Sequence, residues 1–241
     1  MKKFGLIGYP LGHSFSKSYF EEKFAEQHIE ASYDNFPLKE LNEIPALIQL
    51  NQIQGFNVTI PYKEKIIQYL DEIDEVAKLI GAVNCVQIKE GRLIGYNTDV
   101  IGFELSLMKI MQQPIQALVF GTGGSAQAVK FVLRKHQIPF QSVSRNEAKD
   151  CITYADLDEN VMKQYHLLIN TTPVGMYPHI DQVLPLPYQF ISKKHIAFDL
   201  IYNPPKTKFL TFCEAEGAHI KNGLEMLYYQ ADESWRIFMN Q

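Results

Sequence analysis

The chain has 241 residues, enough for one large domain or two modest ones, and 46% of them are hydrophobic, as in an ordinary globular protein. Its 27 acidic and 23 basic residues leave a net charge of −4 without a long run of either sign, so we expect no nucleic acid partner. The 3 cysteines lack CxxC spacing and the 7 histidines lack ligand spacing, which disfavours a disulfide framework and a metal site. Glycine and proline break the first apolar run and no stretch reaches membrane length, so we expect a cytoplasmic protein without a membrane partner.

The first predicted strand ends in a loop that is rich in glycine, proline and hydroxyl groups. Residues 4–7 form a short apolar run, and the loop after them carries Ser14 and Ser16. An amphipathic helix follows, with Ser18 and Glu21 as its capping box. Hydroxyl groups gather at helix starts for capping alone, but two of them in such a loop can also donate to a carboxylate. Both interpretations stay open at this point.

Strands and helices then alternate. Residues 31–36 predict a second strand, and residues 38–51 predict a helix that Pro45 interrupts. A third strand follows at residues 56–60. This alternation predicts a small α/β unit with parallel strands.

Lys63 occupies an unusual place for a lysine. The strand at residues 56–60 alternates apolar and polar side chains, Pro61 ends it, and a helix is predicted directly afterwards. The amides at a helix start disfavour a nearby cation, so a purely structural lysine would suit the other end better. The alternative is an ordinary solvated lysine. We hypothesise that Lys63 carries the chemistry.

A predicted hairpin places two further polar side chains, Asn84 and Asp99, close to each other. Its strands are residues 81–89 and 92–96, joined by a turn. Asn84 and Asp99 lie on or just beyond these neighbouring strands, near enough to face one pocket. In the alternative interpretation, Asp99 is the N-cap of the next helix.

A glycine-rich turn opens the second half of the chain. Residues 117–120 predict a buried strand that leads directly into Gly121-Thr-Gly-Gly-Ser-Ala126 and then a helix. Glycines allow a tight turn and close approach of backbone amides, and the helix start offers N–H groups to a pyrophosphate. The placement between strand and helix predicts a dinucleotide site.

The end of the next strand indicates which dinucleotide. Residues 140–143 lead to Ser144 and Arg145, where an NAD site usually has an acidic residue. An arginine accommodates a 2′-phosphate, so Arg145, with Lys149, favours NADP. Alternatively, Ser144 and Glu147 cap another helix and Arg145 points into water.

The remaining strands also end in polar loops. Residues 167–170 and 197–201 predict strands whose following loops begin with Thr171 and Tyr202. Ligands of a doubly wound sheet lie beyond the carboxyl ends of its strands, so both loops should border the nicotinamide. Apolar residues at helical spacing over 224–238 predict an amphipathic last helix.

Short motifs follow one another along the chain in a definite order. They are Gly8-Tyr-Pro-Leu-Gly-His-Ser-Phe-Ser16, Asn57-Val-Thr-Ile-Pro-Tyr-Lys63, Gly81-Ala-Val-Asn84, Asn97-Thr-Asp99, the turn at Gly121, Asn170 with Gly175-Met176, Tyr202-Asn-Pro204 and Gly223-Leu-Glu-Met-Leu-Tyr-Tyr-Gln230. Over essentially the whole chain this order resembles that of the shikimate dehydrogenase family, and chance rarely produces such a set.

The resemblance implies an α/β fold with two domains. Residues 1–100 and the C-terminal helix 223–241 would form the substrate-binding, catalytic domain, and residues 101–222 a Rossmann-like NADP-binding domain, with the active site in the cleft between them. The implied reaction is the reversible NADPH-dependent reduction of 3-dehydroshikimate to shikimate in aromatic amino acid biosynthesis. A monomer and a homodimer are both compatible with it.

The resemblance also implies residue roles. Lys63 and Asp99 would be the catalytic pair: hydride transfer to the C3 carbonyl builds negative charge on oxygen, which an ammonium stabilises and protonates, while Asp99 keeps Lys63 oriented and charged. The implied substrate-binding residues are Ser14, Ser16, Thr59, Asn84, Tyr202 and Gln230. The cofactor-binding residues are Gly121, Gly123, Gly124, Ser125, Ala126, Ser144, Arg145, Lys149, Thr171 and Gly223.

Three positions depart from the family pattern. Lys17 stands where proline is usual, Cys85 replaces threonine, and Ser144 replaces asparagine before an unusually short segment. Two alternatives remain: an NAD-dependent quinate/shikimate dehydrogenase relative, and a non-catalytic dinucleotide-binding regulator. Arg145 disfavours the first, and the retained catalytic pair disfavours the second.

Overall fold

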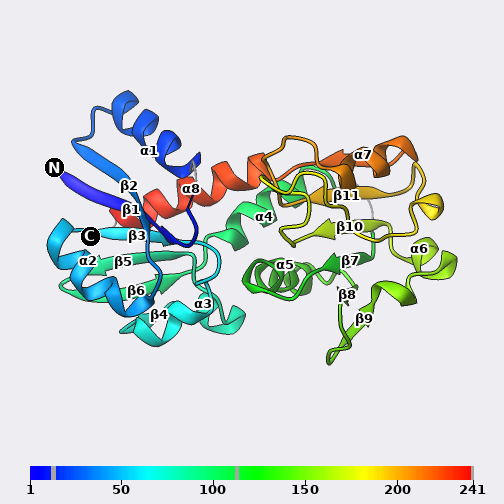
Figure 1. Cartoon of the computed structure of the whole chain (residues 1–241), viewed down its shortest axis with the longest axis horizontal. Helices are drawn as coiled ribbons and strands as arrows, with labels where there is room; N and C mark the ends of the chain where they lie inside the picture. The colour runs from blue at the N-terminus through cyan, green and yellow to red at the C-terminus, as the bar shows by residue number, and fades with distance from the viewer. Residues whose placement is uncertain (12–14, 112–113, 240–241) are drawn as a thin grey trace. The chain divides into compact units, whose positions relative to one another are not determined.

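The computed structural model describes residues 1–11, 15–111 and 114–239. The chain divides into two compact units, of which unit 1 comprises Met1–Thr98 with Ala231–Gln241 and unit 2 comprises Asp99–Gln230. Each unit contains one six-stranded sheet with helices packed against it (Figure 1). The predicted α/β fold class is therefore confirmed.

Unit 1 is built on a mixed sheet with the strand order β2-β1-β3-β5-β6-β4. Its strands are β1 (Lys2–Gly8), β2 (Ala31–Pro37), β3 (Gly55–Val58), β4 (Glu72–Ile73), β5 (Cys85–Lys89) and β6 (Arg92–Tyr96). Its helices are α1 (Phe15–Glu26), η1 (Leu41–Glu43), α2 (Ile44–Asn51), η2 (Lys65–Tyr69), α3 (Glu75–Ile80) and the second half of α8 (Leu224–Met239). β1 runs parallel to both β2 and β3, whereas β5 is antiparallel to β3 and β6.

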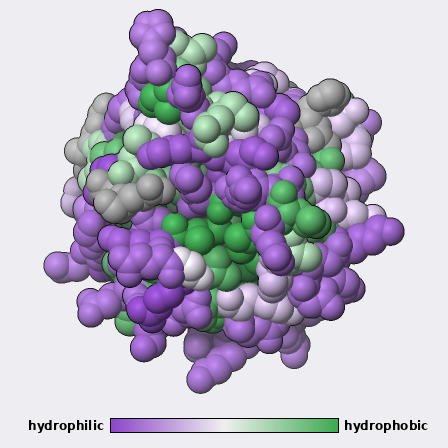
Figure 2. All heavy atoms as spheres, turned by 90° about the vertical axis from the view of Figure 1, so that its left-hand side faces the viewer, coloured by the Kyte–Doolittle hydropathy of each residue, from purple (hydrophilic) through white to green (hydrophobic). Residues whose placement is uncertain are grey.

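The sheet of unit 1 has an apolar core on each face. Alternate residues of β1 point to opposite sides, so Phe4 joins one cluster and Ile7 the other. On the Phe4 side, Phe238 of α8 stacks on Phe4 with ring centroids 4.9 Å apart, and Trp235 meets it edge-on at 5.6 Å. These contacts explain the apolar stripe of the last helix. The face of unit 1 drawn in Figure 2 carries a hydrophobic area ringed by hydrophilic side chains.

Unit 2 is built on an entirely parallel sheet with the strand order β12-β11-β10-β7-β8-β9. Its strands are β7 (Ala117–Phe120), β8 (Phe140–Ser144), β9 (Cys151–Thr153), β10 (Leu167–Asn170), β11 (Ile196–Asp199) and β12 (His219–Lys221). Its helices are α4 (Asp99–Met108), α5 (Gly124–Lys135), η3 (Tyr154–Asp156), α6 (Glu159–Gln164), η4 (Tyr188–Phe190), α7 (Lys208–Ala215) and the first half of α8. Strands β7 and β10 are completely buried, as expected for a parallel sheet covered on both faces.

The structure corrects three local predictions in unit 1. The segment after Pro61 forms only the short 3-10 helix η2, because the chain turns extended at Leu70 and Glu72–Ile73 pair with β6 as strand β4. A separate helix, α3, then starts after its cap Asp74, which accepts from the Val76 amide. Pro45 does not interrupt a helix, since it lies in the first turn of α2, where its missing N–H is harmless. Ser18 is inside α1 and therefore cannot be its N-cap.

The connection between β8 and β9 contains no helix. Parallel strands are usually joined by a dozen or more residues, but here residues 145–150 suffice, and Ser142 pairs with Cys151. The alternative in which Ser144 and Glu147 cap a helix is therefore wrong. The short segment that the sequence indicates is confirmed.

Candidate functional site

In unit 1, backbone hydrogen bonds bring three of the predicted site residues together. β3 and the start of β5 lie side by side, and the Val58 amide donates to the Asn84 carbonyl at 2.9 Å. Thr59 directly follows, and the Val83 amide donates to the Lys63 carbonyl at 2.7 Å. Thr59, Lys63 and Asn84 thus belong to one loop cluster at the carboxyl end of β3.

The turn that carries Lys63 is anchored by its neighbour. The buried Tyr62 hydroxyl lies 2.7 Å from the carbonyl oxygens of both Leu38 and Lys39, and burial raises the pKa of Tyr62. The side chain of Lys63 itself is partly exposed. The protein therefore presents this ammonium from a fixed turn.

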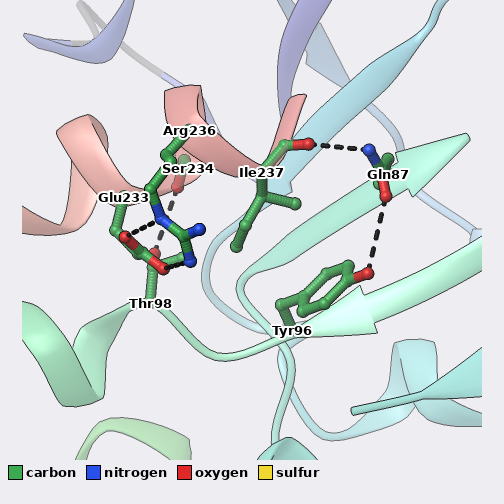
Figure 3. A network of polar contacts seen from close by, with 7 residues as sticks. All are labelled: Gln87, Tyr96, Thr98, Glu233, Ser234, Arg236 and Ile237. Atoms are coloured by element: carbon green, nitrogen blue, oxygen red, sulfur yellow. Dashed lines mark hydrogen bonds and ion pairs between the residues drawn. The ribbon is translucent and has the colours of Figure 1, made fainter. Parts of the chain in front are cut away.

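The Asn84 side chain belongs to a buried polar network with Asn57, Thr98 and Ser234. Its side-chain oxygen accepts from the Thr98 amide at 2.7 Å, and its side-chain nitrogen donates to the Thr98 hydroxyl at 3.0 Å. The Thr98 hydroxyl lies 3.1 Å from that of Ser234 on α8 (Figure 3). Asn57 donates to the same Ser234 hydroxyl at 2.8 Å. All four side chains are at least nine-tenths buried, so the Asn84 amide is held in one orientation.

The network also reaches the first loop. The Tyr33 hydroxyl donates to the Asn57 side-chain oxygen at 2.9 Å and is hydrogen-bonded to Ser16. Ser16 is partly buried in the first turn of α1. Ser14 lies outside the described residues. The sequence did not predict Tyr33 or Asn57 as supporting residues.

The end of α8 is fastened to the hairpin of unit 1. The Gln87 side chain of β5 donates to the Ile237 carbonyl at 2.7 Å and accepts from the Tyr96 hydroxyl at 3.5 Å (Figure 3). Arg236 instead pairs with Glu233 on the outer side of the helix. The fixed helix end places Ser234 in the polar network.

In unit 2, the glycine turn forms a cradle at the carboxyl end of β7. Gly121 has φ +113, a conformation that favours glycine, and an added Cβ would lie 2.6 Å from the Thr171 hydroxyl. Gly123 is the N-cap of α5 without a side-chain cap, and apart from its immediate neighbours in the chain no heavy atom of the described residues lies within 4 Å of the position of its missing Cβ. Gly124, Ser125 and Ala126 form the first turn of α5. An open glycine before a helix start with no side-chain cap fits a pyrophosphate.

Arg145 and Lys149 lie in the short link after β8, and both are exposed. Ser144 is the last residue of β8. Tyr154 stands beside them: burial raises its pKa to about 12, and the positive charge of Arg145 partly opposes this. Its ring stacks on Phe120 with centroids 6.0 Å apart. Tyr154 therefore connects the end of β7 with the cationic link, a role that no pattern in the sequence indicates.

A buried carboxylate joins the ends of β10 and β11. Asp199 Oδ1 accepts from the Asn170 side chain and from the Ile201 amide, each at 3.0 Å, and its Oδ2 accepts from the Thr207 hydroxyl at 2.6 Å. Asn170 and Asp199 are both 0% exposed. Burial raises the pKa of Asp199 to about 6 although all three hydrogen bonds lower it.

Asp199 should make stability depend on pH. Because its folded pKa of about 6 exceeds the ordinary 3.8, its contribution to stability is complete below about pH 4 and is lost as the pH rises through 6. A difference of about 2 pKa units corresponds to roughly 3 kcal/mol. Asp199→Asn cannot titrate, so the unfolding free energy of wild type minus variant should fall by up to that amount between these limits. Urea unfolding of both proteins at several pH values measures it, and a constant difference would contradict the assignment.

Two further predicted residues lie on packed helices of unit 2. Asp99 is the first residue of α4 and is 5% exposed. Gly102 of the same helix approaches α8 so closely that an added Cβ would lie 3.1 Å from Gln230 Cβ. The structure thus brings the helix turns of Asp99 and Gln230 near each other.

Gly223 has a packing role at the start of α8. An added Cβ would lie 2.0 Å from the Leu200 carbonyl oxygen, and the Gly223 amide donates to the Ile201 carbonyl at 3.0 Å. Tyr202 follows in the same loop after β11, and burial raises its pKa. Gly223 is therefore bonded to the loop after β11 at Ile201, the residue next to Tyr202.

Metal ligation and membrane insertion find no support in the described residues. Within residues 1–11, 15–111 and 114–239, no group of three or more His, Cys, Asp or Glu side chains could hold a metal ion. Among the helices of these described ranges, none has the length and apolar character needed to span a membrane.

Comparison with known proteins gives consistent similarities. A family model described as the shikimate dehydrogenase substrate binding domain matches residues 6–86. The shikimate dehydrogenase (NADP(+)) of Bacillus cereus strain B4264 is 39% identical over 254 residues, which cover 96% of this chain and 91% of the relative.

Solved structures extend these similarities to the whole fold. Shikimate dehydrogenase from Aquifex aeolicus is 31% identical, with a TM-score of 0.90 over 100% of this chain and 93% of that chain. Shikimate 5-dehydrogenase from Thermus thermophilus, solved in complex with NADP(H) and shikimate, is 30% identical, with a TM-score of 0.87 over 100% of this chain and 94% of that chain. The similarity therefore includes both units.

Proposed function

Because the chain belongs to the shikimate dehydrogenase family, we propose that it catalyses the reversible reduction of 3-dehydroshikimate to shikimate with NADPH, a step of aromatic amino acid biosynthesis. The observation that carries this conclusion is 39% identity over 96% of the chain to an NADP-dependent shikimate dehydrogenase. The predicted family, activity and cofactor are confirmed by these relatives. The roles of individual residues are our proposals.

One assay tests the function. The purified protein, mixed with shikimate and NADP, should form NADPH at a rate proportional to enzyme concentration. Parallel reactions with quinate and with NAD separate the alternative of an NAD-dependent quinate/shikimate dehydrogenase relative. Cofactor binding without turnover of either substrate would instead support a non-catalytic regulator.

We propose that Lys63 acts as the general acid in the direction of reduction. Hydride addition at C3 places negative charge on the carbonyl oxygen, and the Lys63 ammonium stabilises that charge and donates its proton. Asp99 would complete the catalytic pair by binding the ammonium and keeping it charged. The fixed turn around Tyr62 supports this role, because general acid catalysis requires a donor held at the reacting atom.

The other polar groups would bind the substrate. Hydroxyl groups are neutral donors suited to a carboxylate, and amide side chains can donate to and accept from ring hydroxyls. We assign Ser14, Ser16, Thr59 and Tyr202 to the carboxylate, and Asn84, Asp99 and Gln230 to the hydroxyls. The double hydrogen bond between Asn84 and Thr98 supports this, because it fixes the amide in advance of binding.

The residues of the glycine cradle would hold the cofactor, which supplies the transferred hydride when bound. The open position above Gly123 leaves room for the pyrophosphate, and the start of α5 directs N–H groups and positive partial charge towards it. Thr171 adjoins Gly121 and would contact the same group. Gly223 lies between β12 and α8, its amide donates to the Ile201 carbonyl in the loop after β11, and it would border the nicotinamide end.

Arg145 should decide between NADP and NAD. Its guanidinium can bind a 2′-phosphate through paired hydrogen bonds, an interaction that NAD lacks. We expect Arg145→Ala to raise the KM for NADP about 10- to 100-fold, equivalent to roughly 1.4 to 2.8 kcal/mol, with little change for NAD. Steady-state kinetics with both cofactors measure this. An equal rise of the KM for both cofactors would argue against a 2′-phosphate contact. Arg134→Ala is the control: Arg134 lies in the last turn of α5, at the other end of that helix from the glycine turn, so its replacement should leave both KM values unchanged.

Location and assembly stay predictions. The three cysteines are free thiols, which agrees with the reducing cytoplasm that we propose. Gel filtration would distinguish the monomer from the homodimer.

A further inference from the structure

The Asp199 carboxylate connects the end of β10 with the loop after β11, because it accepts hydrogen bonds from Asn170, the last residue of β10, and from the Ile201 amide. It is 0% exposed and receives three hydrogen bonds in all. A buried charge is costly unless it is well paired, so such a group needs a reason beyond packing.

The first of the two loops is held through Asn170. This side chain donates to Asp199 at 3.0 Å, which fixes the direction of its own oxygen. That oxygen accepts from the Thr172 amide at 2.9 Å and from the Thr172 hydroxyl at 2.7 Å. Thr171 lies between Asn170 and Thr172, beside the glycine cradle. Asp199 therefore orients a loop that we assign to the cofactor.

The second loop is held directly. The Ile201 amide donates to Asp199 at 3.0 Å, and the Ile201 carbonyl accepts from the Gly223 amide at 3.0 Å. Tyr202, assigned to the substrate carboxylate, is the next residue. The Thr207 hydroxyl, which caps α7, completes the carboxylate shell at 2.6 Å. One carboxylate thus fixes residues that we assign to two different ligands.

We propose that Asp199 is a positioning residue of the reaction, holding the Thr171 and Tyr202 loops in the arrangement that binds cofactor and substrate. This inference rests on the proposed function. An asparagine can keep the acceptor oxygen for Asn170 and Ile201 and can donate to the Thr207 hydroxyl. Alanine removes all three interactions. The acceptor geometry, more than the charge, is what the two loops require.

Three variants test the proposal. Asp199→Ala should lower kcat/KM about 10- to 100-fold, mainly by raising the KM for both NADP and shikimate, because both loops lose their anchor. Asp199→Asn should restore both values to within about threefold of wild type. Met162→Ala removes a completely buried core side chain of α6 in the same unit. It should lower the melting temperature while leaving both KM values unchanged.

The outcomes separate the proposal from its premise. If wild type does not turn over shikimate, the proposed function fails, and fluorescence titration with NADPH still reports on the Thr171 loop: weaker binding to Asp199→Ala supports its anchoring. If wild type is active, unchanged KM values in folded Asp199→Ala overturn the proposal. Equal KM changes in Met162→Ala would also overturn it, because they would indicate general destabilisation. An Asp199→Asn variant as impaired as Asp199→Ala would overturn it as well.

Discussion

Replacing Lys63 by methionine is expected to lower kcat about 100- to 10,000-fold, the usual contribution of a positioned general acid. Methionine keeps an unbranched stem of similar length but has no proton to donate and no charge for the developing oxyanion. Since these interactions strengthen only in the transition state, the KM for shikimate should change much less than kcat. Initial rates of NADPH formation at saturating cofactor measure both constants.

Lys65 provides the matched control for this experiment. It is an exposed lysine at the start of η2, two positions further along the same segment. Lys65→Met should leave kcat unchanged and should unfold within about 0.5 kcal/mol of wild type, as is typical of surface changes. A Lys63→Met enzyme that retains wild-type turnover would exclude Lys63 as the acid.

Adding one methyl group at Gly223 should destabilise the protein by about 3 kcal/mol, near the upper end for overpacking. The new Cβ would lie 2.0 Å from the oxygen and 2.5 Å from the carbon of the Leu200 carbonyl. These are backbone atoms of the segment that follows β11, so they cannot move aside as a flexible side chain does. Denaturant unfolding of Gly223→Ala measures the loss.

Gly123 makes the complementary comparison. Its φ is −76, and beyond its chain neighbours the described part of the chain has no heavy atom within 4 Å of the added Cβ, so Gly123→Ala should be as stable as wild type. The methyl group would nevertheless enter the space that we assign to the pyrophosphate, and the KM for NADP should rise. Gly223→Ala with wild-type stability would contradict the packing argument, and Gly123→Ala with wild-type NADP kinetics would contradict the cradle.

Local patterns were sufficient for much of the fold. The alternation in β3, the turn between β5 and β6, and the strand–glycine–helix order of β7 and α5 depend on neighbouring residues, so the sequence displays them directly. Helix type after Pro61 was not predictable in the same way. Apolar spacing over 66–73 fits a helix, but Ile73 belongs to β4, whose pairing with β6 is a tertiary contact.

The candidate site was predictable in its motifs but not in its supports. Asn57, Thr98 and Ser234 come from distant parts of the sequence, and no periodicity relates them. Asp199 did carry a signal, since a carboxylate at the end of an otherwise apolar strand needs partners. Its partner Asn170 is on the adjacent strand, and only the sheet register identifies that pair.

The helix-free link between β8 and β9 has a thermodynamic consequence for anion recognition. Arg145 and Lys149 lie on a six-residue link, residues 145–150, whose two ends are fixed by the pairing of β8 with β9. The backbone of this link therefore has few alternative conformations, and it would lose little conformational entropy on binding a phosphate. For the 2′-phosphate contact that we propose for Arg145 and Lys149, the shortness of this link would add to the effect of their charge. Glycines inserted into the link would therefore be expected to lower the affinity for NADP, although Arg145 and Lys149 would both be retained.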